Sequence, residues 1–430
     1  MADKSKEEKV PKLTKTAKIK LHASIEAQKE LDDTVVAYTK ACNYLSSVVF
    51  ETGLKSQPKL HKITYAILRE EYDMPSQMAQ SAMKTVLARY KAARTNGHRL
   101  KNRIQFRKGE YDLVYNRDYS LKKDGRFSLN TVNAGRVKVS FETKGMLGYF
   151  DGTWEYGTAK LIRTKRGYFL HIPMTREIEK FEYTKTTPVT GIDLGQNFLA
   201  VSADKKGRSR FYKGRHVKDK RARFKEKRTQ LQKRGTASAR RRLKRIGQRE
   251  NRWMRDVNHC VSKALVENAE PKTLFAIEDL TGIRQATVKV RKKNRYVSVS
   301  WAFYDLRQKL EYKAKEAGME VIALDPKYSS QCCPKCGNTD RHNRDKRRHA
   351  FKCKVCNYQS NDDRIGGINM RMRGEKYLNE KISLVTEACP DGQGRSQSSR
   401  DASLRTGDKR RKAKAVRTAE QMQAPSIASA

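Results

Sequence analysis

Hydrophobic residues recur with two different periods along this chain, and the changes of period mark its candidate parts. Residues 14–21 alternate as a short strand. From about Ser24 the apolar residues step by four and three, which predicts a helix, and similar patterns with nearby prolines predict helices at 58–72 and 76–93. We therefore expect a small helical unit, and core packing alone explains its apolar stripe.

The period returns to two between about residues 103 and 185. Val137, Val139 and Phe141 alternate with polar residues, and a turn at 165–167 separates two apolar stretches, which predicts a hairpin. This region indicates an antiparallel β barrel or small sandwich that the helical unit interrupts.

From residue 188 onward the pattern follows the order β-β-β-α-β-α-β, which predicts an α/β core. The expected elements are strands at 190–195, 197–203 and 209–213, helices at about 217–247 and 250–268, a strand at 273–279, a helix at about 301–317, a strand at 319–324 and a last helix that opens near Asp363. Beyond about residue 378 the pattern fades, and we expect 385–430 to be a disordered basic tail.

The charge balance indicates a polyanionic partner. The 430 residues carry 94 Lys plus Arg against 47 Asp plus Glu, a formal net charge of +47. So large a surplus opposes compaction unless a polyanion neutralises it, and nucleic acid is the expected polyanion. The sequence has no apolar run long enough for a membrane span and no apolar stretch typical of a secretory signal, so we expect no membrane partner.

Three acidic residues stand in chemically suggestive positions. Asp193 lies in Thr-Gly-Ile-Asp-Leu-Gly, Glu278 follows the predicted strand 274–277, and Asp363 lies near the start of the last helix. A carboxylate among apolar strand residues is unfavourable unless it is paired or binds a metal. Three carboxylates brought together by the fold would repel one another unless cations lie between them, so they predict two Mg²⁺ ions that hydrolyse a phosphodiester.

Each acid also has a plainer interpretation when it is taken alone. Asp193 fits a turn, Glu278 fits a solvated strand end, and Asp363 fits a helix cap. Their order, with the expected strands and helix around them, favours one shared site. Gly191 and Gly195, beside the first acid, would allow a substrate backbone to approach closely.

Four cysteines between the second and third acids form a metal-binding pattern. Cys333 with Cys336 and Cys353 with Cys356 are two C-x₂-C pairs separated by 16 residues, the spacing of a zinc ribbon. Four thiolates complete a tetrahedral shell, so one structural Zn²⁺ is expected. Cys332 would give a C-x₃-C pair with Cys336, so Cys333 is the expected ligand. The remaining cysteines are scattered, as in a reducing compartment.

Two further features of the sequence concern surface chemistry. His342 and His349, in the cysteine spacer, are expected at the surface or facing nucleic acid, because four thiolates already satisfy zinc. Residues 215–250 hold sixteen Lys or Arg against three Asp or Glu. Such a run is either a solvated face or, beside a nuclease site, a helical clamp on phosphates. The expected contacts of that clamp are Arg221, Arg223, Lys225, Arg228, Arg240, Arg241, Arg242, Lys244 and Arg245.

The run at 312–331, followed by the cysteine pairs, resembles the TnpB family of transposon-encoded proteins and the related miniature type V CRISPR effectors. The resemblance covers about residues 14–375. The acid motifs are similar to the split RuvC nuclease motifs of that family, and Asp193, Glu278 and Asp363 fall on its catalytic positions.

The resemblance implies an RNase H-like (RuvC) nuclease core with a zinc-ribbon insertion. A wedge domain, an oligonucleotide-binding β barrel, precedes the core and holds a helical recognition insertion. The implied ranges are 1–22 and 103–187 for the wedge, 23–102 for the recognition domain, 188–326 and 361–384 for the nuclease core, 327–360 for the zinc-ribbon target-nucleic-acid-binding module and 385–430 for the tail.

The function implied by the resemblance is that of an RNA-guided DNA endonuclease. Such a protein binds a structured guide RNA, recognises a short motif flanking the target, and cuts both strands of the DNA. The expected partners are the guide RNA and double-stranded and single-stranded target DNA, and the expected catalytic cofactor is two Mg²⁺ ions. We expect a cytoplasmic, nucleoid-associated prokaryotic protein, as a monomer or a guide-bound homodimer. Whether the guide derives from a transposon end or a CRISPR array is not encoded in this chain.

One motif departs from the family pattern. Many relatives have Asp-Arg-Asp, then Asn and two Ala, where this chain has Asn-Asp-Asp-Arg-Ile-Gly-Gly at 361–367. The aspartate is present, so we expect the altered surroundings to affect the rate more than the chemistry, and the two glycines to permit tight packing.

Three other functions stay open at this point. A nuclease-silent, RNA-guided DNA-binding repressor is disfavoured by the intact acid triad. A DDE-type transposase would share the fold and the metal chemistry, but the zinc ribbon just before the last acid favours the guided nuclease. A zinc-ribbon binding protein without catalysis would leave the acids unexplained.

Overall fold

The computed structural model describes residues 10–280 and 303–387, except residues 99, 108, 144 and 196. The expected tail at 385–430 lies outside the described residues beyond 387. Within the described ranges, no helix has both the length and the apolar character needed to cross a membrane. The fold is of mixed α/β type and contains three sheets.

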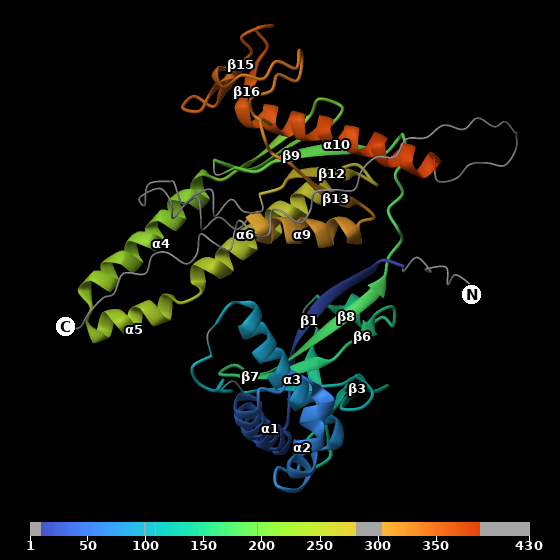
Figure 1. Ribbon diagram of the computed structural model, residues 1–430, viewed down its shortest axis with the longest axis vertical. Helices are drawn as coiled ribbons and strands as arrows, with labels where there is room; N and C mark the ends of the chain where they lie inside the picture. Colours follow the sequence, from blue (N-terminus) through green and yellow to red (C-terminus); the bar gives the residue numbers. More distant parts are fainter. Residues whose placement is uncertain are drawn as a thin grey trace, which may run out of the picture. The chain divides into compact units, whose positions relative to one another are not determined.

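The largest sheet has eight antiparallel strands and follows the period of two seen in the sequence (Figure 1). Its order is β2-β7-β8-β1-β5-β4-β3, and β6 also pairs with β8. The strands are β1 Lys12–His22, β2 Glu110–Leu113, β3 Tyr119–Leu121, β4 Phe127–Asn130, β5 Arg136–Glu142, β6 Glu155–Tyr156, β7 Ala159–Thr164 and β8 Gly167–Glu177. The predicted hairpin is confirmed, since β7 and β8 pair up to Thr164 and Gly167.

The sequence indicated a β barrel or a small sandwich, and in the described residues this sheet is open rather than closed into a barrel. β2 and β3 end the pairing order and do not pair with each other. Helices from the inserted unit pack against β2 and belong to the same apolar core. Side-chain packing therefore covers the sheet edge that strand pairing would cover in a closed barrel.

The inserted unit consists of α1 Ile25–Thr52, α2 Gln57–Glu70 and α3 Ser76–Thr95. The predicted start of α1 is confirmed by its cap, because the Ser24 hydroxyl accepts a hydrogen bond from the Ala27 N–H. The helix ends at Gly53, which adopts the left-handed conformation that glycine tolerates best.

The second sheet has five strands in the order β11-β10-β9-β12-β13. β9, β12 and β13 are parallel, and β10 and β11 are added antiparallel. The elements are β9 Val189–Asp193, β10 Phe198–Ala203, β11 Ser209–Lys213, α4 Arg215–Arg234, α5 Ala237–Ile246, α6 Arg249–Glu267, β12 Leu274–Glu278, α9 Phe303–Glu316, β13 Glu320–Leu324 and α10 Asp362–Glu387.

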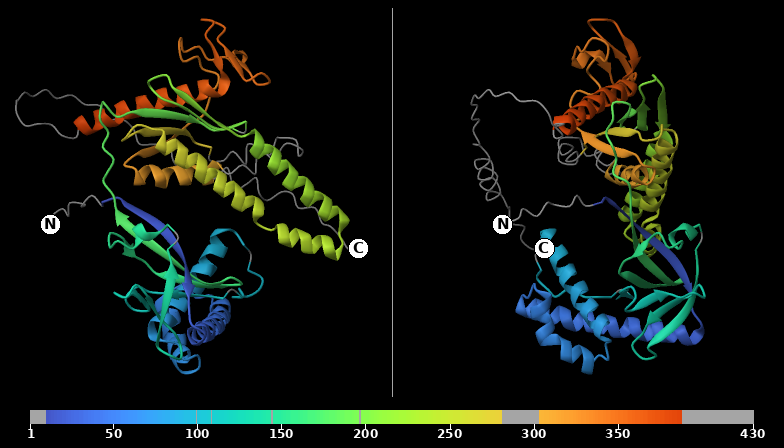
Figure 2. Two further views of the ribbon diagram at one scale, coloured as in Figure 1. Left: turned by 180° about the vertical axis from the view of Figure 1, so that it is seen from behind. Right: turned by 90° about the vertical axis from the view of Figure 1, so that its right-hand side faces the viewer.

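Helices cover both faces of this sheet. α6 and α9 lie on one face, where Ile192, Phe275 and Ile277 join their apolar core, and α10 lies on the other (Figures 1 and 2). The α10 face carries small residues: a Cβ at Gly191 would collide with the backbone of Gly367 in α10. The helix backbone therefore packs directly on the strand, which only glycine allows.

One predicted helix, at 217–247, is divided in two. Gly235 has φ +63°, which ends α4, and the Thr236 hydroxyl caps α5 by accepting from the Ala239 N–H. The sequence signals of a glycine stop and a threonine cap are both present there, and the continuous run of basic residues obscured them.

The third sheet belongs to the cysteine module. It contains β14 Arg344–Asp345, β15 Ala350–Lys352 and β16 Gln359–Asn361, all antiparallel, and leads directly into α10.

Candidate functional site

The first two acids lie side by side at the ends of neighbouring parallel strands. Asp193 is the last residue of β9, and Glu278 is the last residue of β12. Ile192 is paired with Ile277, so the acids that follow them occupy adjacent positions. Side chains alternate along a strand, and the isoleucines face α6 and α9, so both acids face α10.

The third acid reaches the same place from α10. Asp363 lies in the first turn of that helix, and its N–H donates to Oδ1 of Asn361 and to Oδ1 of Asp362. A Cβ at Gly366 would lie 2.5 Å from Oδ1 of Asp193, so this turn of α10 contacts the first acid directly. The predicted tight packing at this glycine is confirmed.

Electrostatics indicate that the three carboxylates interact. Burial raises the pKa of Asp193 well above its usual value, and the charges of Glu278 and then Asp363 raise it further. Burial also raises the pKa of Glu278 and of Asp363. All three side chains belong to residues less than one tenth exposed. Carboxylates in this situation favour protons or metal ions over the free ionised state.

Glu278 is held by a loop that leads into the cysteine module. The buried Ser329 hydroxyl donates to Oε1 of Glu278 at 2.8 Å. Asn369 of α10 donates to the carbonyls of Ser329 and Cys332, at 2.6 and 2.8 Å. This loop therefore links an acid, the last helix and the first cysteine pair.

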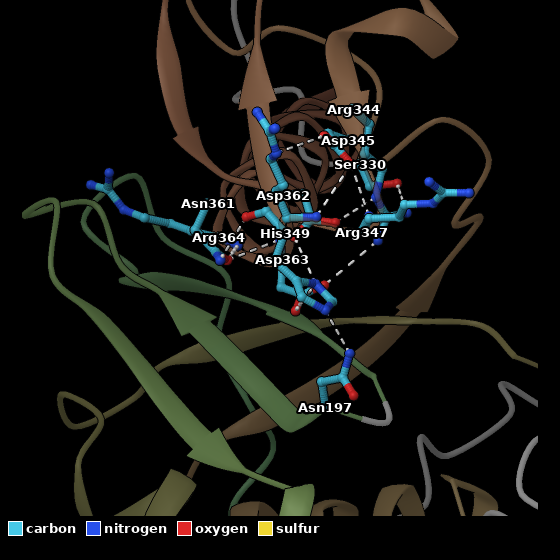
Figure 3. A network of polar contacts seen from close by, with 11 residues as sticks. Asn197, Ser330, Arg344, Asp345, Arg347, His349, Asn361, Asp362, Asp363 and Arg364 are labelled. Carbon is cyan, nitrogen blue, oxygen red and sulfur yellow. Dashed lines mark hydrogen bonds and ion pairs between the residues drawn. The ribbon is translucent and has the colours of Figure 1, made fainter.

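Asp362, next to the third acid, is fully buried and anchored by Arg344 of β14 (Figure 3). Arg344 Nε lies 2.6 Å from Oδ2 of Asp362, and its NH1 group donates to the Ser330 hydroxyl at 2.7 Å. Another nitrogen of the same guanidinium lies 3.6 Å from Oδ1 of Asp363. The cysteine module therefore supplies the counter-charge for this pair of aspartates.

His349 also lies at the site, with its side chain 33% exposed, and the expectation that it faces nucleic acid stays a prediction. Its ring points to Asp362 and Asp363 on one side and to Asn197 on the other (Figure 3). His342, by contrast, is exposed and contacts Asp340. No periodicity or spacing in the sequence distinguishes the two histidines, because the distinction arises only when β15 is placed beside α10.

The four predicted cysteines come together. Their sulfur atoms lie within 4.8 Å of one another, with 3.5 Å between the sulfurs of Cys333 and Cys356 and between those of Cys336 and Cys353. Tetrahedral Zn–S bonds of about 2.3 Å place sulfurs at about this separation. The thiols share their protons unequally: backbone N–H groups, first that of Cys356, lower the pKa of Cys353 to about 6, whereas the pKa of Cys336 is raised to about 12 and burial raises that of Cys333. The fit to zinc therefore rests on the four sulfur positions. The residues present therefore fit one structural zinc ion.

The glycines beside Asp193 have a different role from the one expected. The space at Gly191 is filled by the backbone of α10 rather than left for a substrate. A Cβ at Gly195 would lie 2.9 Å from the Phe198 carbonyl, which closes the turn between β9 and β10.

The predicted phosphate clamp divides into buried and exposed members. Arg221 is 4% exposed, and its Nε lies 3.1 Å from Oε1 of Glu250, a buried acid of α6. The prediction that Arg221 binds nucleic acid is therefore wrong, because it joins α4 to α6. Arg228 contacts the other oxygen of Glu250 at 2.5 Å and is partly buried, as is Lys225. The exposed members are Arg223, Arg240, Arg241, Arg242, Lys244 and Arg245.

Comparisons with known proteins find relatives over parts of this chain. Residues 303–370 match a family model described as the Cas12f1-like TNB domain, and residues 171–286 match one described as a probable transposase. The CRISPR-associated endodeoxyribonuclease Cas12f1 of Sulfoacidibacillus thermotolerans is 39% identical over 128 residues, 29% of this chain and 28% of the relative. The TnpB-like protein MJ0751 of Methanocaldococcus jannaschii is 34% identical over 123 residues, 28% of this chain and 43% of the relative.

The chain thus spans less than half of the length of these two curated relatives. A solved structure described as a Cas12f1-sgRNA-target DNA complex covers 84% of this chain and 99% of its own, with a TM-score of 0.54 and 12% identity. That likeness concerns the fold.

Proposed function

We propose that this chain, which is related to the TnpB proteins and the miniature type V CRISPR effectors, is an RNA-guided DNA endonuclease. The observation that carries the proposal is the convergence of Asp193, Glu278 and Asp363, three buried acids from two parallel strands and a helix start. The name of the Cas12f1 relative, an endodeoxyribonuclease, supports the same chemistry.

The acid side chains suit Mg²⁺, which prefers carboxylate oxygens. Asp193, Glu278 and Asp363 would hold two ions. Because two such ions lie about 4 Å apart, the carboxylate oxygens that bind them need not all lie close to one another. When bound, the ions supply a hydroxide nucleophile and stabilise the leaving 3′ oxygen. The Ser329 hydroxyl orients Glu278, and Arg344 fixes Asp362, whose Oδ1 accepts the Asp363 N–H.

The remaining parts then take the roles that relatives suggest. Residues 188–326 and 361–384 form a RuvC-like core, and 327–360 form a zinc-ribbon module that binds target nucleic acid. The sheet of residues 1–22 and 103–187 acts as a wedge, and the helical unit 23–102 recognises guide RNA and a short motif flanking the target. Guide pairing supplies sequence choice, while the protein reads the flanking motif and duplex shape.

The exposed face of α5 is the expected phosphate contact of this core. Arg240, Arg241 and Arg242 follow one another there, and all three are exposed. Exposed guanidinium groups bind phosphates without sequence preference and make binding dependent on salt. Target DNA and guide RNA are both compatible with this surface. The protein would act inside a prokaryotic cell, as a monomer or as a guide-bound homodimer.

A strand-transferring enzyme is the second candidate, because one matched family model is described as a probable transposase. It would use the same acids. The products separate the two functions: hydrolysis leaves free 3′ ends, and strand transfer leaves joined DNA.

Replacement of Glu278 by Gln tests the proposal. This change keeps the size of the side chain and the hydrogen bond from Ser329 but removes the charge. We expect DNA cleavage in Mg²⁺ to fall by roughly 10³-fold or more, with guide RNA and target binding unchanged. Cleavage by Glu278→Gln at the wild-type rate would refute the assignment.

A further inference from the structure

His349 is held in an unusual position at the edge of the acid site. It precedes β15 and has φ +51°, a left-handed conformation that non-glycine residues seldom adopt. Its carbonyl accepts hydrogen bonds from the Asp362 N–H and from the Asn361 side chain, at 3.3 and 3.0 Å. The start of α10 thereby fixes the backbone from which the imidazole projects.

One ring nitrogen has a defined partner. Nε2 lies 2.7 Å from the amide nitrogen of Asn197, in the turn between β9 and β10. An amide nitrogen can only donate, so Nε2 accepts and the ring proton resides on Nδ1. Asn197 therefore selects the tautomer that presents an N–H to the aspartates.

The other ring nitrogen faces two carboxylates. Nδ1 of His349 is buried and, within the described part of the chain, makes no hydrogen bond. It lies 3.3 Å from Oδ1 of Asp362 and 3.9 Å from Oδ2 of Asp363 (Figure 3). Buried donors in native proteins almost always have a partner, so a donor left over at this point needs an explanation.

The two carboxylates differ in the hydrogen bonds that their oxygens already accept. Oδ2 of Asp362 is taken by Arg344, and Oδ1 accepts the Asp363 N–H. Oδ2 of Asp363 has no comparable hydrogen bond among the described residues, although its backbone is fixed in the helix turn. Oδ1 of Asp362, at 3.3 Å, is the nearer acceptor for Nδ1–H, and a carboxylate oxygen can accept a second hydrogen bond, so the imidazole faces both aspartates.

We infer that His349 is a positioning residue, whose Nδ1–H lies against Oδ1 of Asp362 and Oδ2 of Asp363 and so determines which edge of the Asp363 carboxylate faces Asp193 and Glu278. This inference rests on the proposed function, in which Asp363 holds a metal ion. Hydrogen bonds from outside the ligand shell fix carboxylate orientation at metal sites, and their loss typically lowers metal affinity about 10- to 100-fold.

The inference also gives the zinc module a second task. His349 and Arg344 come from its β hairpin, and both act on the Asp362–Asp363 pair. The module thus contributes to the geometry of the acid site in addition to any contact with nucleic acid.

Mn²⁺ binding to the full-length protein, followed by electron paramagnetic resonance, tests the inference without use of catalysis. We compare His349→Ala, His349→Asn and His349→Gln, since an Asn amide can replace Nδ1–H whereas a Gln amide reaches toward the Nε2 position. We expect about 10- to 100-fold weaker binding for the Ala and Gln variants and recovery of most of the affinity in the Asn variant. Zinc content and circular dichroism should match the wild type.

The outcomes separate the two levels of the argument. If Asp193→Asn leaves Mn²⁺ affinity unchanged, the acid site itself is not a metal site and the proposed function fails. If Asp193→Asn loses affinity but the Asn and Gln variants of His349 behave alike, only the positioning role fails. Spin-echo modulation from a directly bound histidine nitrogen would also overturn the inference, because His349 would then be a ligand.

Discussion

At the scale of residues, the site depends on side-chain alternation in two short strands. Asp193 and Glu278 share a face with Gly191 and Ala276, and the absence of bulk at these two positions lets α10 approach. This packing brings Asp193 and Glu278 close to Asp363 and removes the two side chains from solvent. Such a site favours cation binding, but its buried carboxylates destabilise the fold when no cation is bound.

The raised pKa of Asp193 predicts a pH-dependent gain in stability for Asp193→Asn. Between the usual carboxyl pKa of about 3.9 and the raised value, the folded chain holds more protons than the unfolded chain, so stability falls as pH rises. Without metal at pH 7.5, the variant should therefore melt higher than the wild type, by about 2–4 °C per kcal/mol gained. The difference should disappear near pH 3.5.

Thermal melts in EDTA and in Mg²⁺ measure this effect. Mg²⁺ should stabilise the wild type and leave Asp193→Asn unchanged, since only the former binds it at this site. Asp345→Asn is the matched control with the opposite sign, because backbone N–H groups lower the pKa of Asp345. A wild type that is more stable than Asp193→Asn at pH 7.5 in EDTA would show that burial does not dominate at this carboxylate.

Gly366→Ala should damage the site although alanine is the better helix former. Propensity alone would stabilise α10 by about 1 kcal/mol, but the added Cβ would lie 2.5 Å from Oδ1 of Asp193. We expect loss of Mn²⁺ binding out of proportion to any change in melting temperature. Gly374→Ala, whose Cβ would meet Ala276 and Val189, should lower stability while metal binding is kept. Equal effects of the two variants on metal binding would contradict this account.

The sequence predicted the acids because each stands where a strand ends or a helix begins, and these contexts are local. It could not predict Asn197, Arg344 or His349 as members of the site. Arg344 and His349 reach the aspartates, and Asn197 reaches His349, through tertiary contacts across 13 to 152 residues. Arg221 was misassigned for the same reason. A basic run does not reveal which arginine meets a buried glutamate on another helix.

At the scale of elements, α4 and α5 carry buried and exposed arginines of one basic run. We expect Arg221→Ala to lower the free energy of unfolding by about 1–3 kcal/mol, because buried Glu250 loses one hydrogen-bonded partner and keeps Arg228. Arg241→Ala, on the exposed face of α5, should change stability by less than about 0.5 kcal/mol. It should instead reduce by about one the slope of log binding constant against log salt for nucleic acid.

Urea unfolding and salt-dependent binding of a nonspecific DNA duplex separate the two arginines. Unchanged unfolding of Arg221→Ala, or an unchanged salt slope for Arg241→Ala, would each refute its half of this division.

Element order was largely predictable, and the errors have physical causes. The strands that carry the acids and the helices around them fall within a few residues of expectation, because their hydrophobic periods are strong. The division of the predicted helix at Gly235 was missed, because the basic residues on both sides of this glycine form one continuous run. The openness of the first sheet was not predictable, since pairing between distant edge strands is not encoded in local alternation.

At the scale of the molecule, the zinc module and the acid site form one connected structure. Ser329 reaches Glu278 from the first cysteine pair, and His349 reaches the aspartates from the hairpin before the second. The third acid follows the cysteine module directly along the chain, so both belong to one connected fold. This connection explains why the two strongest sequence motifs occur in one order.

The measurement that tests the central claim most directly is guided cleavage by the protein with its own RNA. The protein is purified with the RNA that accompanies it, the RNA is sequenced, and plasmids are built that carry its variable segment beside a randomised flank. In Mg²⁺ the wild type should cut plasmids that match the RNA and carry one short flanking motif, while Asp193→Asn should bind the same plasmids without cutting them. Cleavage that ignores the match, or cleavage by Asp193→Asn, would contradict the account.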